Sequence, residues 1–298
     1  MNEDKKEKVI QRAVLAEKLM TGLFWLVGGL VLGFLILLTG YIIIKGIVSF
    51  YPAILSTTRE GILNQLWNTI YLVILSLLIS VPLGIAAGIY IAEYAKPGKL
   101  LNFLSICIEA LSSIPSIVIG LFAYLVFILM TGSSWSLFAG ALAVSILSLP
   151  LITTTTRDAF AALPVGYKEG AFALGASHWE VIRTVLLPAA FSRILTGIIM
   201  AAGRGFGEAA ALLYTAGQST AINWNNWNIA SPTCPLNPFR PGETLSLHIW
   251  VMRTEGSLNP HANEIASVAS AVLVIISLLF SVVLRSYSSK LEKKRNGK

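Results

Sequence analysis

The sequence has few charged residues, few histidines and only two cysteines. Charged residues make up 12% of the 298 residues, against roughly a quarter in soluble domains. Hydrophobic residues make up 55%, and the mean hydropathy is +0.73. Cys107 and Cys234 are too far apart to indicate a disulfide framework, and His178, His248 and His261 are scattered. These shortages argue against a soluble enzyme, and they predict no metal site.

The sequence also lacks the short motifs of nucleotide chemistry. It has no G-x-x-x-x-G-K-[ST] phosphate loop, so we expect the chain itself to bind no ATP and to hold no cofactor. The glycines around Arg204 lie inside an apolar run without a preceding strand, which excludes a dinucleotide loop. No G-x-S-x-G elbow occurs either, so an enzymatic function has no support. The net charge of +7 comes from the termini and a few loops, which indicates membrane topology rather than nucleic-acid binding.

What the sequence does have is a series of apolar runs near the length that crosses a bilayer. We therefore expect an all-α, multi-pass protein of the cell membrane. The first run is too long for a signal peptide and is taken as a retained span. The six predicted transmembrane helices are Thr21–Ile44, Leu66–Ala92, Phe103–Met130, Ser136–Ile152, Phe191–Ala216 and Ile265–Leu284.

Lysine and arginine are distributed unequally between the two sides of these spans. The N-terminus, the loops after spans two and four, and the C-terminal tail hold 17 of the 22. Because cytoplasmic loops carry the excess of basic residues, both termini are predicted to be cytoplasmic. The predicted regions are 1–63 (N-terminus, first helix and outer loop), 64–287 (five-helix transmembrane domain, with a cytoplasmic loop 153–188 and an outer loop 217–264) and 288–298 (basic cytoplasmic tail).

The 217–264 loop is too long to be a simple turn. It contains Trp224, Trp227 and Trp250 and several prolines. Tryptophans anchor proteins at the lipid headgroups, and they also form docking surfaces for partners. The sequence leaves both roles open.

Three charged residues fall inside predicted spans. Arg204 and Glu208 are four apart, so on one helix they would share a face. A charge at this depth is costly and usually faces a cavity or a pathway. Arg204 could meet an oxyanion with its guanidinium fork, or it could only neutralise Glu208. Glu109 could pair with Arg204, pair with a cation of another subunit, or be solvated near the cytoplasmic face.

The cytoplasmic loop has the signals of a helical hairpin. Pro164 suits the first turn of a helix over Val165–Leu174, and Gly175 can adopt the left-handed conformation that ends it. Ser177 and Glu180 then form a capping box for a second helix. We expect this second helix to stop at Pro188, just before the fifth span.

This loop resembles the EAA loop of binding-protein-dependent ABC importer permeases, whose pattern is E-A-A-x3-G-x9-I-x-L-P. Gly170 replaces an alanine of that pattern and Val185 replaces the isoleucine. The resemblance implies that the loop docks into a cytoplasmic ATPase dimer, which binds ATP and Mg²⁺, and that it transmits closure of the dimer to the membrane. The positions carried over are Glu169, Gly170, Ala171, Gly175, Leu187 and Pro188.

Roughly Asn64–Leu284 also resembles the PstA-type phosphate permeases. The similar segments are Ile114–Phe122, Arg204–Glu208 and Thr244–Trp250, the last with departures at Ser246 and His248. This resemblance implies a phosphate pathway that contains Arg204, a second, PstC-like permease, and an extracytoplasmic phosphate-binding protein. The alternative is a permease for another oxyanion or small solute. A secondary transporter would predict internal repeats, which the sequence does not show.

Overall fold

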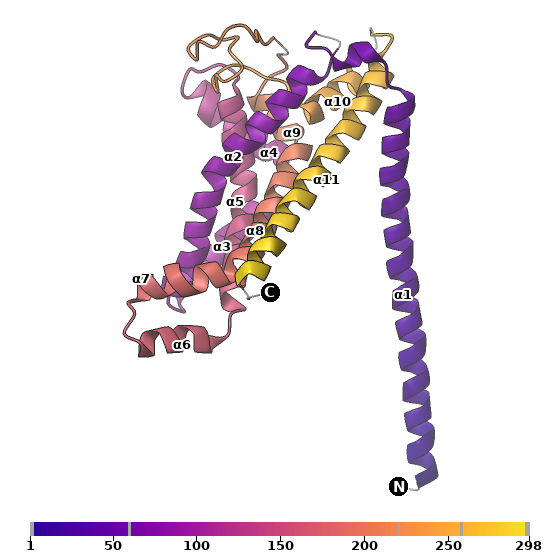
Figure 1. The fold of residues 1–298 in the computed structure, drawn as a ribbon, viewed down its shortest axis with the longest axis vertical. Helices are drawn as coiled ribbons and strands as arrows, with labels where there is room; N and C mark the ends of the chain where they lie inside the picture. Colours follow the sequence, from indigo (N-terminus) through magenta and orange to yellow (C-terminus); the bar gives the residue numbers. More distant parts are fainter. Residues whose placement is uncertain (1–2, 59–60, 220, 257–258, 296–298) are drawn as a thin grey trace.

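The computed structural model describes residues 3–58, 61–219, 221–256 and 259–295, and the regular structure in these ranges is entirely helical. Four long helices form the bundle: α2 (Leu63–Ile89), α5 (Leu137–Ala161), α8 (Leu187–Gly207) and α11 (Ala262–Arg295). Figure 1 shows them lying side by side. An all-α membrane protein is therefore confirmed.

The central pair of the bundle is α2 against α5, and glycine allows the two helices to approach closely. A Cβ added to Gly84 would lie 2.8 Å from Ile152, and one added to Gly88 would lie 2.5 Å from Thr156. Small residues at such crossings let backbones touch in lipid, where apolar surface alone gives little drive for association.

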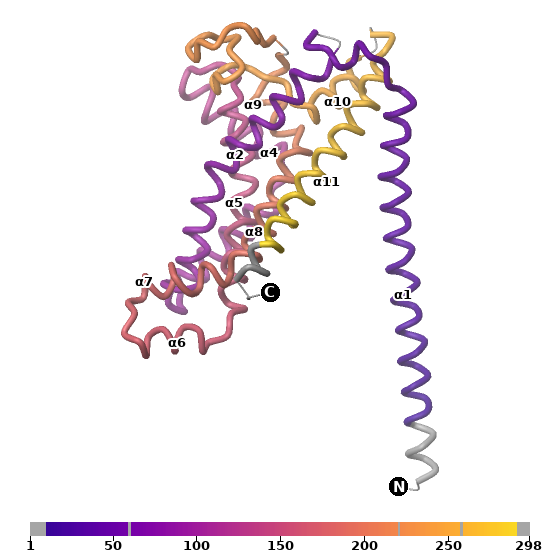
Figure 2. Tube along the Cα trace, in the orientation of Figure 1, coloured from indigo at the N-terminus to yellow at the C-terminus, as the bar shows by residue number. Residues whose placement is uncertain are grey.

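Helix α1 (Glu3–Val48) is longer than the predicted first span and stands apart from the bundle (Figure 1). Its membrane-compatible stretch is Ile10–Val48, and none of its most apolar window is buried within the chain. It meets the bundle only near its C-terminal end, where Gly46 lies against Ala271 of α11. Figure 2 shows the rest of α1 diverging from the bundle.

The third predicted span is broken, which corrects the expectation of one straight helix over Phe103–Met130. Helix α3 (Lys99–Ser113) and helix α4 (Ser116–Tyr124), prolonged by a π-helical turn η3 (Leu125–Leu129), meet at a bend of 99°. Pro115 has no N–H to continue the hydrogen bonds of the helix, and the backbone of Ile114 before it is extended. Among the described residues, five helices are long and apolar enough to span a membrane, or six if the bent pair counts as one.

The fifth predicted span is also interrupted. Helix α8 ends at Gly207, and helix α9 (Ala210–Thr215) starts after a break of two residues. The other spans are longer than expected, since α5 continues to Ala161 and α11 to Arg295.

The two ends of the bundle carry different structures. One end carries helix α6 (Val165–Ala173) and helix α7 (His178–Glu180), and we call Val165–Glu180 the hairpin. The opposite end carries the 3₁₀ turn η1 (Pro52–Leu55), helix α10 (Leu245–Thr254) and the rest of the 217–264 loop (Figure 2). Leu245 of α10 is buried with Ile265 of α11 in one hydrophobic cluster.

Candidate functional site

Arg204 lies on the exposed face of α8, one turn before the helix ends. The neighbouring exposed positions on this face are Met200, Gly203 and Gly207. A Cβ added to either glycine would meet nothing within 4 Å. The guanidinium donates one hydrogen bond, from Nη1 to the carbonyl of Leu147 (3.3 Å). Its other donors have no hydrogen-bond partner in the described part of the chain, so the site is a tethered cation on an open surface.

Glu208 does not pair with Arg204, which corrects the predicted shared helix face. Because α8 ends at Gly207, Glu208 leaves the helical path and is buried, with 8% of its surface exposed. Its carboxylate accepts a hydrogen bond from the amide of Ala211 (3.0 Å), so it caps α9. Its backbone carbonyl accepts a hydrogen bond from the Ser246 hydroxyl (2.6 Å).

Ser246 is therefore a residue that the sequence analysis noted only as a departure. It lies in the first turn of α10 and is 7% exposed. Through Glu208 it connects the 217–264 loop to the break that follows Arg204. The position of Ser246 in the sequence does not indicate its contact with Glu208.

Glu109 is separate from Arg204. It is an exposed residue of α3, before the bend at Pro115, and it makes no ion pair with any described residue. Of the three predicted pathway residues, Arg204 alone thus combines an open face of a candidate membrane span with donors that have no partner among the described residues.

The hairpin forms as predicted in its local details. Gly175 has a φ of +83°. The capping box is present, with the Ser177 amide donating to the Glu180 carboxylate (2.7 Å). The prediction that the second helix stops at Pro188 is wrong: α7 continues through a π-helical turn, η4 (Val181–Leu186), directly into α8. Pro188 is the second residue of α8 and lies inside this continuous helical run.

The carried-over hairpin residues lie on two sides of this motif. Glu169, Gly170 and Gly175 are exposed, and the Leu174 side chain is 90% exposed. Ala171 and Leu187 instead pack against the buried cluster that includes Ile182. The hairpin therefore has an anchored apolar side and an open side that can receive a partner.

The 217–264 loop contains a buried polar cluster that the sequence analysis missed. Arg240 is 1% exposed. Its Nη2 donates to the Asn68 side-chain oxygen (2.6 Å) and the Pro235 carbonyl (3.3 Å). Burial lowers the pKa of Arg240 to about 10, so it stays protonated at neutral pH. Nearby, the buried Glu243 carboxylate contacts His248 Nδ1 (2.9 Å).

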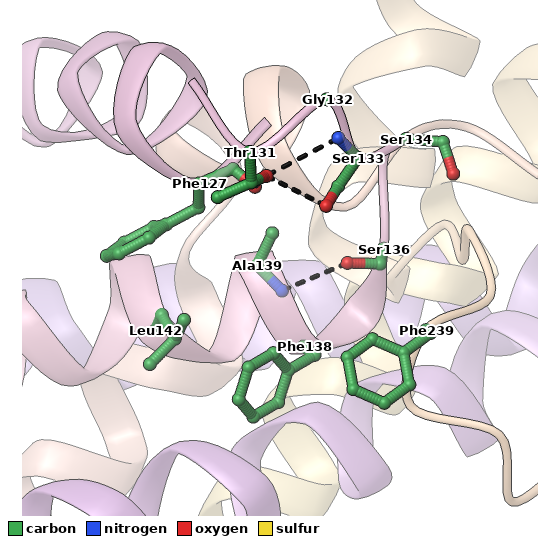
Figure 3. Close-up of a pocket in the computed structure, with 10 residues that line it drawn as sticks. All are labelled: Phe127, Thr131, Gly132, Ser133, Ser134, Ser136, Phe138, Ala139, Leu142 and Phe239. Atoms are coloured by element: carbon green, nitrogen blue, oxygen red, sulfur yellow. Dashed lines mark hydrogen bonds between the residues drawn. The ribbon is translucent and has the colours of Figure 1, made fainter. Parts of the chain in front are cut away.

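A cavity of about 510 Å³ lies at the same end of the bundle (Figure 3). Its lining side chains carry no charge. Thr131 bonds to Ser133 across its rim, and the ring of Phe138 faces that of Phe239. A multiply charged anion would find no counter-charge there, so Arg204 is the stronger candidate for anion contact. The lining residues are Phe127, Thr131, Gly132, Ser133, Ser134, Ser136, Phe138, Ala139, Leu142 and Phe239.

Comparison with known sequences gives one family. The sequence profile described as "Binding-protein-dependent transport system inner membrane component" matches residues 80–296. The probable ABC transporter permease protein YqgI of Bacillus subtilis is 43% identical over 94% of this chain and 97% of its own length. The phosphate transport system permease protein PstA of Xylella fastidiosa is 39% identical, over 53% of this chain and 55% of its own length.

Solved structures show the same fold. A chain of the bacterial alginate ABC transporter, in complex with an alginate pentasaccharide-bound periplasmic protein, matches with a TM-score of 0.63 and 16% identity, over 96% of this chain and 98% of its own length. A chain of the MetNI methionine ABC transporter in an inward-facing conformation matches with a TM-score of 0.56 and 18% identity, over 81% of this chain and 99% of that chain. At these identities the likeness shows the fold alone.

Proposed function

Because the chain belongs to the binding-protein-dependent transport system inner membrane components, and is thus a permease subunit of an ABC importer, we propose that its cargo is inorganic phosphate. Relatives named as phosphate permeases support this cargo, although they align over about half of the chain. Solved structures of the same fold belong to methionine and alginate transporters. The fold therefore leaves the cargo open, and the proposal rests on the site.

The observation that carries the proposal is Arg204. It presents a guanidinium with free donors on an exposed face that two neighbouring glycines keep open. A guanidinium fork matches the geometry of a phosphate better than an ammonium does, and two parallel hydrogen bonds can form. A cation at this depth in the membrane costs about 2.5–3.5 kcal/mol. A role in anion transfer accounts for that cost, since no carboxylate of the described chain pairs with Arg204.

The exposed face of α8 needs a cover, because lipid would not solvate Arg204. We assign that cover to a second, PstC-like permease, so that the anion pathway runs between the two chains. The exposed side of the hairpin then docks on a cytoplasmic ATPase dimer, which holds the ATP and Mg²⁺. The 217–264 loop faces an extracytoplasmic phosphate-binding protein, and both termini are cytoplasmic.

The transport cycle follows from these contacts. Closure of the ATPase dimer moves the hairpin, and α8 moves with it because η4 joins them without a loop. Arg204 lies near the other end of α8, so its access to the two sides of the membrane changes. Phosphate exchanges its hydration shell for fixed donors during this passage.

The test is phosphate uptake by the reconstituted complex with Arg204→Gln, measured together with ATP hydrolysis. Arg285→Gln is the matched control, because Arg285 is an exposed arginine near the hairpin end of α11. We expect uptake to fall at least tenfold in Arg204→Gln, with assembly and hydrolysis retained, and no change in the control. Undiminished uptake would refute the role of Arg204. Wild-type uptake of another oxyanion in preference to phosphate would refute the cargo.

A further inference from the structure

A buried carboxylate joins the end of the second span to the hairpin. Glu93 lies in the π-helical turn η2 (Tyr90–Tyr94), which prolongs α2 at the hairpin end of the bundle. Its side chain is 9% exposed, although it lies among charged and exposed segments. Its Oε2 accepts from the Lys168 ammonium and contacts His178 Nε2 (3.2 Å).

The two partners of Glu93 come from the two arms of the hairpin. Lys168 is a residue of α6 and immediately precedes Glu169, whereas His178 is the first residue of α7. The His178 ring is also in contact with aromatic rings on both sides, with centroids 4.8 Å from Tyr94 and 6.1 Å from Phe172. One carboxylate oxygen therefore contacts both α6 and α7, and it adds a polar contact to the apolar packing of Ile89 and Ala92 against the cluster that includes Ile182.

Covalent connections do not provide this link. The chain runs from α5 into the hairpin at one end and from the hairpin into α8 at the other. Helix α2 is distant in sequence from both arms, so Glu93 supplies its polar contact with them. A buried carboxylate that loses its cations is strongly destabilising, whereas an exposed ion pair contributes little. The Glu93 side chain is 9% exposed and its two partners are about one-third exposed, so the link lies between these two cases.

We propose that Glu93 is a positioning residue that couples the hairpin to α2. When the ATPase subunits displace the hairpin, α2 moves with α8 instead of remaining in place. Because α2 packs along α5 through Gly84 and Gly88, the movement reaches the centre of the bundle. This inference rests on the proposed transport function for its consequence, although the link itself does not depend on the cargo.

The test uses the complete complex, with both permeases, the ATPase subunits and the binding protein in lipid. Glu93→Gln keeps the size of the side chain and removes its charge. Asp158→Asn is the control, because Asp158 forms an exposed ion pair with Arg157 near the same end of the bundle. One readout is amide hydrogen exchange over residues 165–186, and the other is the uptake of phosphate per ATP hydrolysed.

We expect Glu93→Gln to raise exchange in the hairpin about tenfold and to lower uptake per ATP about tenfold, a typical coupling effect. Hydrolysis and exchange in α11 should stay at wild-type levels, and Asp158→Asn should resemble wild type. Glu93→Lys should be worse than Glu93→Gln, because three basic groups would then meet. Adding Lys168→Glu to Glu93→Lys should restore much of both readouts, since a pair of opposite charges forms again.

Unchanged hairpin exchange in Glu93→Gln would overturn the proposal, as would a charge swap that rescues nothing. A rise in exchange across the whole chain, with hydrolysis and uptake falling together, would mean a merely structural role and would also overturn it. The exchange readout needs no cargo. A wild-type complex that takes up no phosphate would therefore refute the proposed cargo and leave the comparison of hairpin exchange intact.

Discussion

Arg204 and Arg240 both lack a carboxylate partner in the described part of the chain, yet their surroundings differ. Arg240 is fully buried and donates to Asn68 and Pro235, at the end of the bundle that carries α10. Arg204 is exposed on α8 and donates one bond to Leu147. The Arg240 guanidinium is enclosed by the chain, whereas the Arg204 guanidinium is open and keeps most of its donors.

The difference teaches how to distinguish a structural cation from one that can serve a passing anion. Arg240 is 1% exposed, so a passing anion cannot reach its guanidinium, although its buried Nε has no hydrogen-bond partner among the described residues. Arg240 therefore stabilises the 217–264 loop over the end of α2. Arg204 stays available to an anion, but it needs a partner surface that shields it from lipid.

The largest effect should come from Arg240→Met. This change leaves the buried Asn68 oxygen without its arginine donor, whereas the Pro235 carbonyl keeps a bond from the Trp67 indole. We expect a cost of about 3 kcal/mol in the free energy of unfolding. Thermal unfolding of the purified complex, compared with that of Arg204→Met, measures the difference. Equal stability of the two variants would break the contrast between a structural and an available arginine.

A smaller effect should follow from Arg204→Lys, which keeps the charge and removes the fork. If two parallel hydrogen bonds matter, phosphate uptake should fall about tenfold. This loss corresponds to a rise of about 1.4 kcal/mol in the transport barrier. Uptake at saturating phosphate and the unfolding temperature should be measured on the same preparation. Wild-type uptake in this variant would mean that Arg204 acts as a point charge only.

Ser246→Ala tests the contact between the two regions. It removes the hydroxyl that donates to the Glu208 carbonyl at the break between α8 and α9. One hydrogen bond is worth about 1 kcal/mol, so uptake should fall about fivefold while assembly persists. A loss no greater than that of Ser270→Ala, a half-buried serine that bonds within α11, would show that the break does not depend on α10.

The smallest effect should come from Glu208→Gln. The side-chain oxygen that accepts from Ala211 is kept, so we expect less than a twofold change in uptake, since neutral and charged caps differ by about 0.5 kcal/mol. A loss as large as that of Arg204→Gln would instead indicate that the two side chains pair during transport. Uptake measured with both variants in parallel decides the point.

The parts of the fold that depend on neighbouring residues could be predicted from the sequence. The apolar runs locate the spans, and the hairpin turn at Gly175 and the cap at Ser177 are set by signals only a few residues long. The breaks in the third and fifth spans could not be predicted in this way. Pro82 and Pro150 lie inside continuous helices, so proline alone does not explain the bend at Pro115.

The same limit applies to the candidate site. Arg204 is conspicuous because its charge interrupts an apolar run. The roles of Glu208 and Ser246 depend on their contact with each other, and the two residues are 38 positions apart in the sequence. Nothing in the local sequence distinguishes Arg240 from an ordinary loop residue. Its burial depends on a contact with Asn68, which is distant in the sequence. Contacts between distant segments are what the sequence pattern leaves out.

The separation of α1 from the bundle has a consequence for the order of assembly. The main contact of α1 within the chain is with α11, through Gly46 and Ala271. A ribosome must synthesise residues 49 to 261 before α11 begins, which takes roughly 10–40 s at about 5–20 residues per second. During this interval α1 has only lipid or another protein as a neighbour. The first helix to be made is thus the last to pack against the rest of its own chain. A second subunit has time to bind it first.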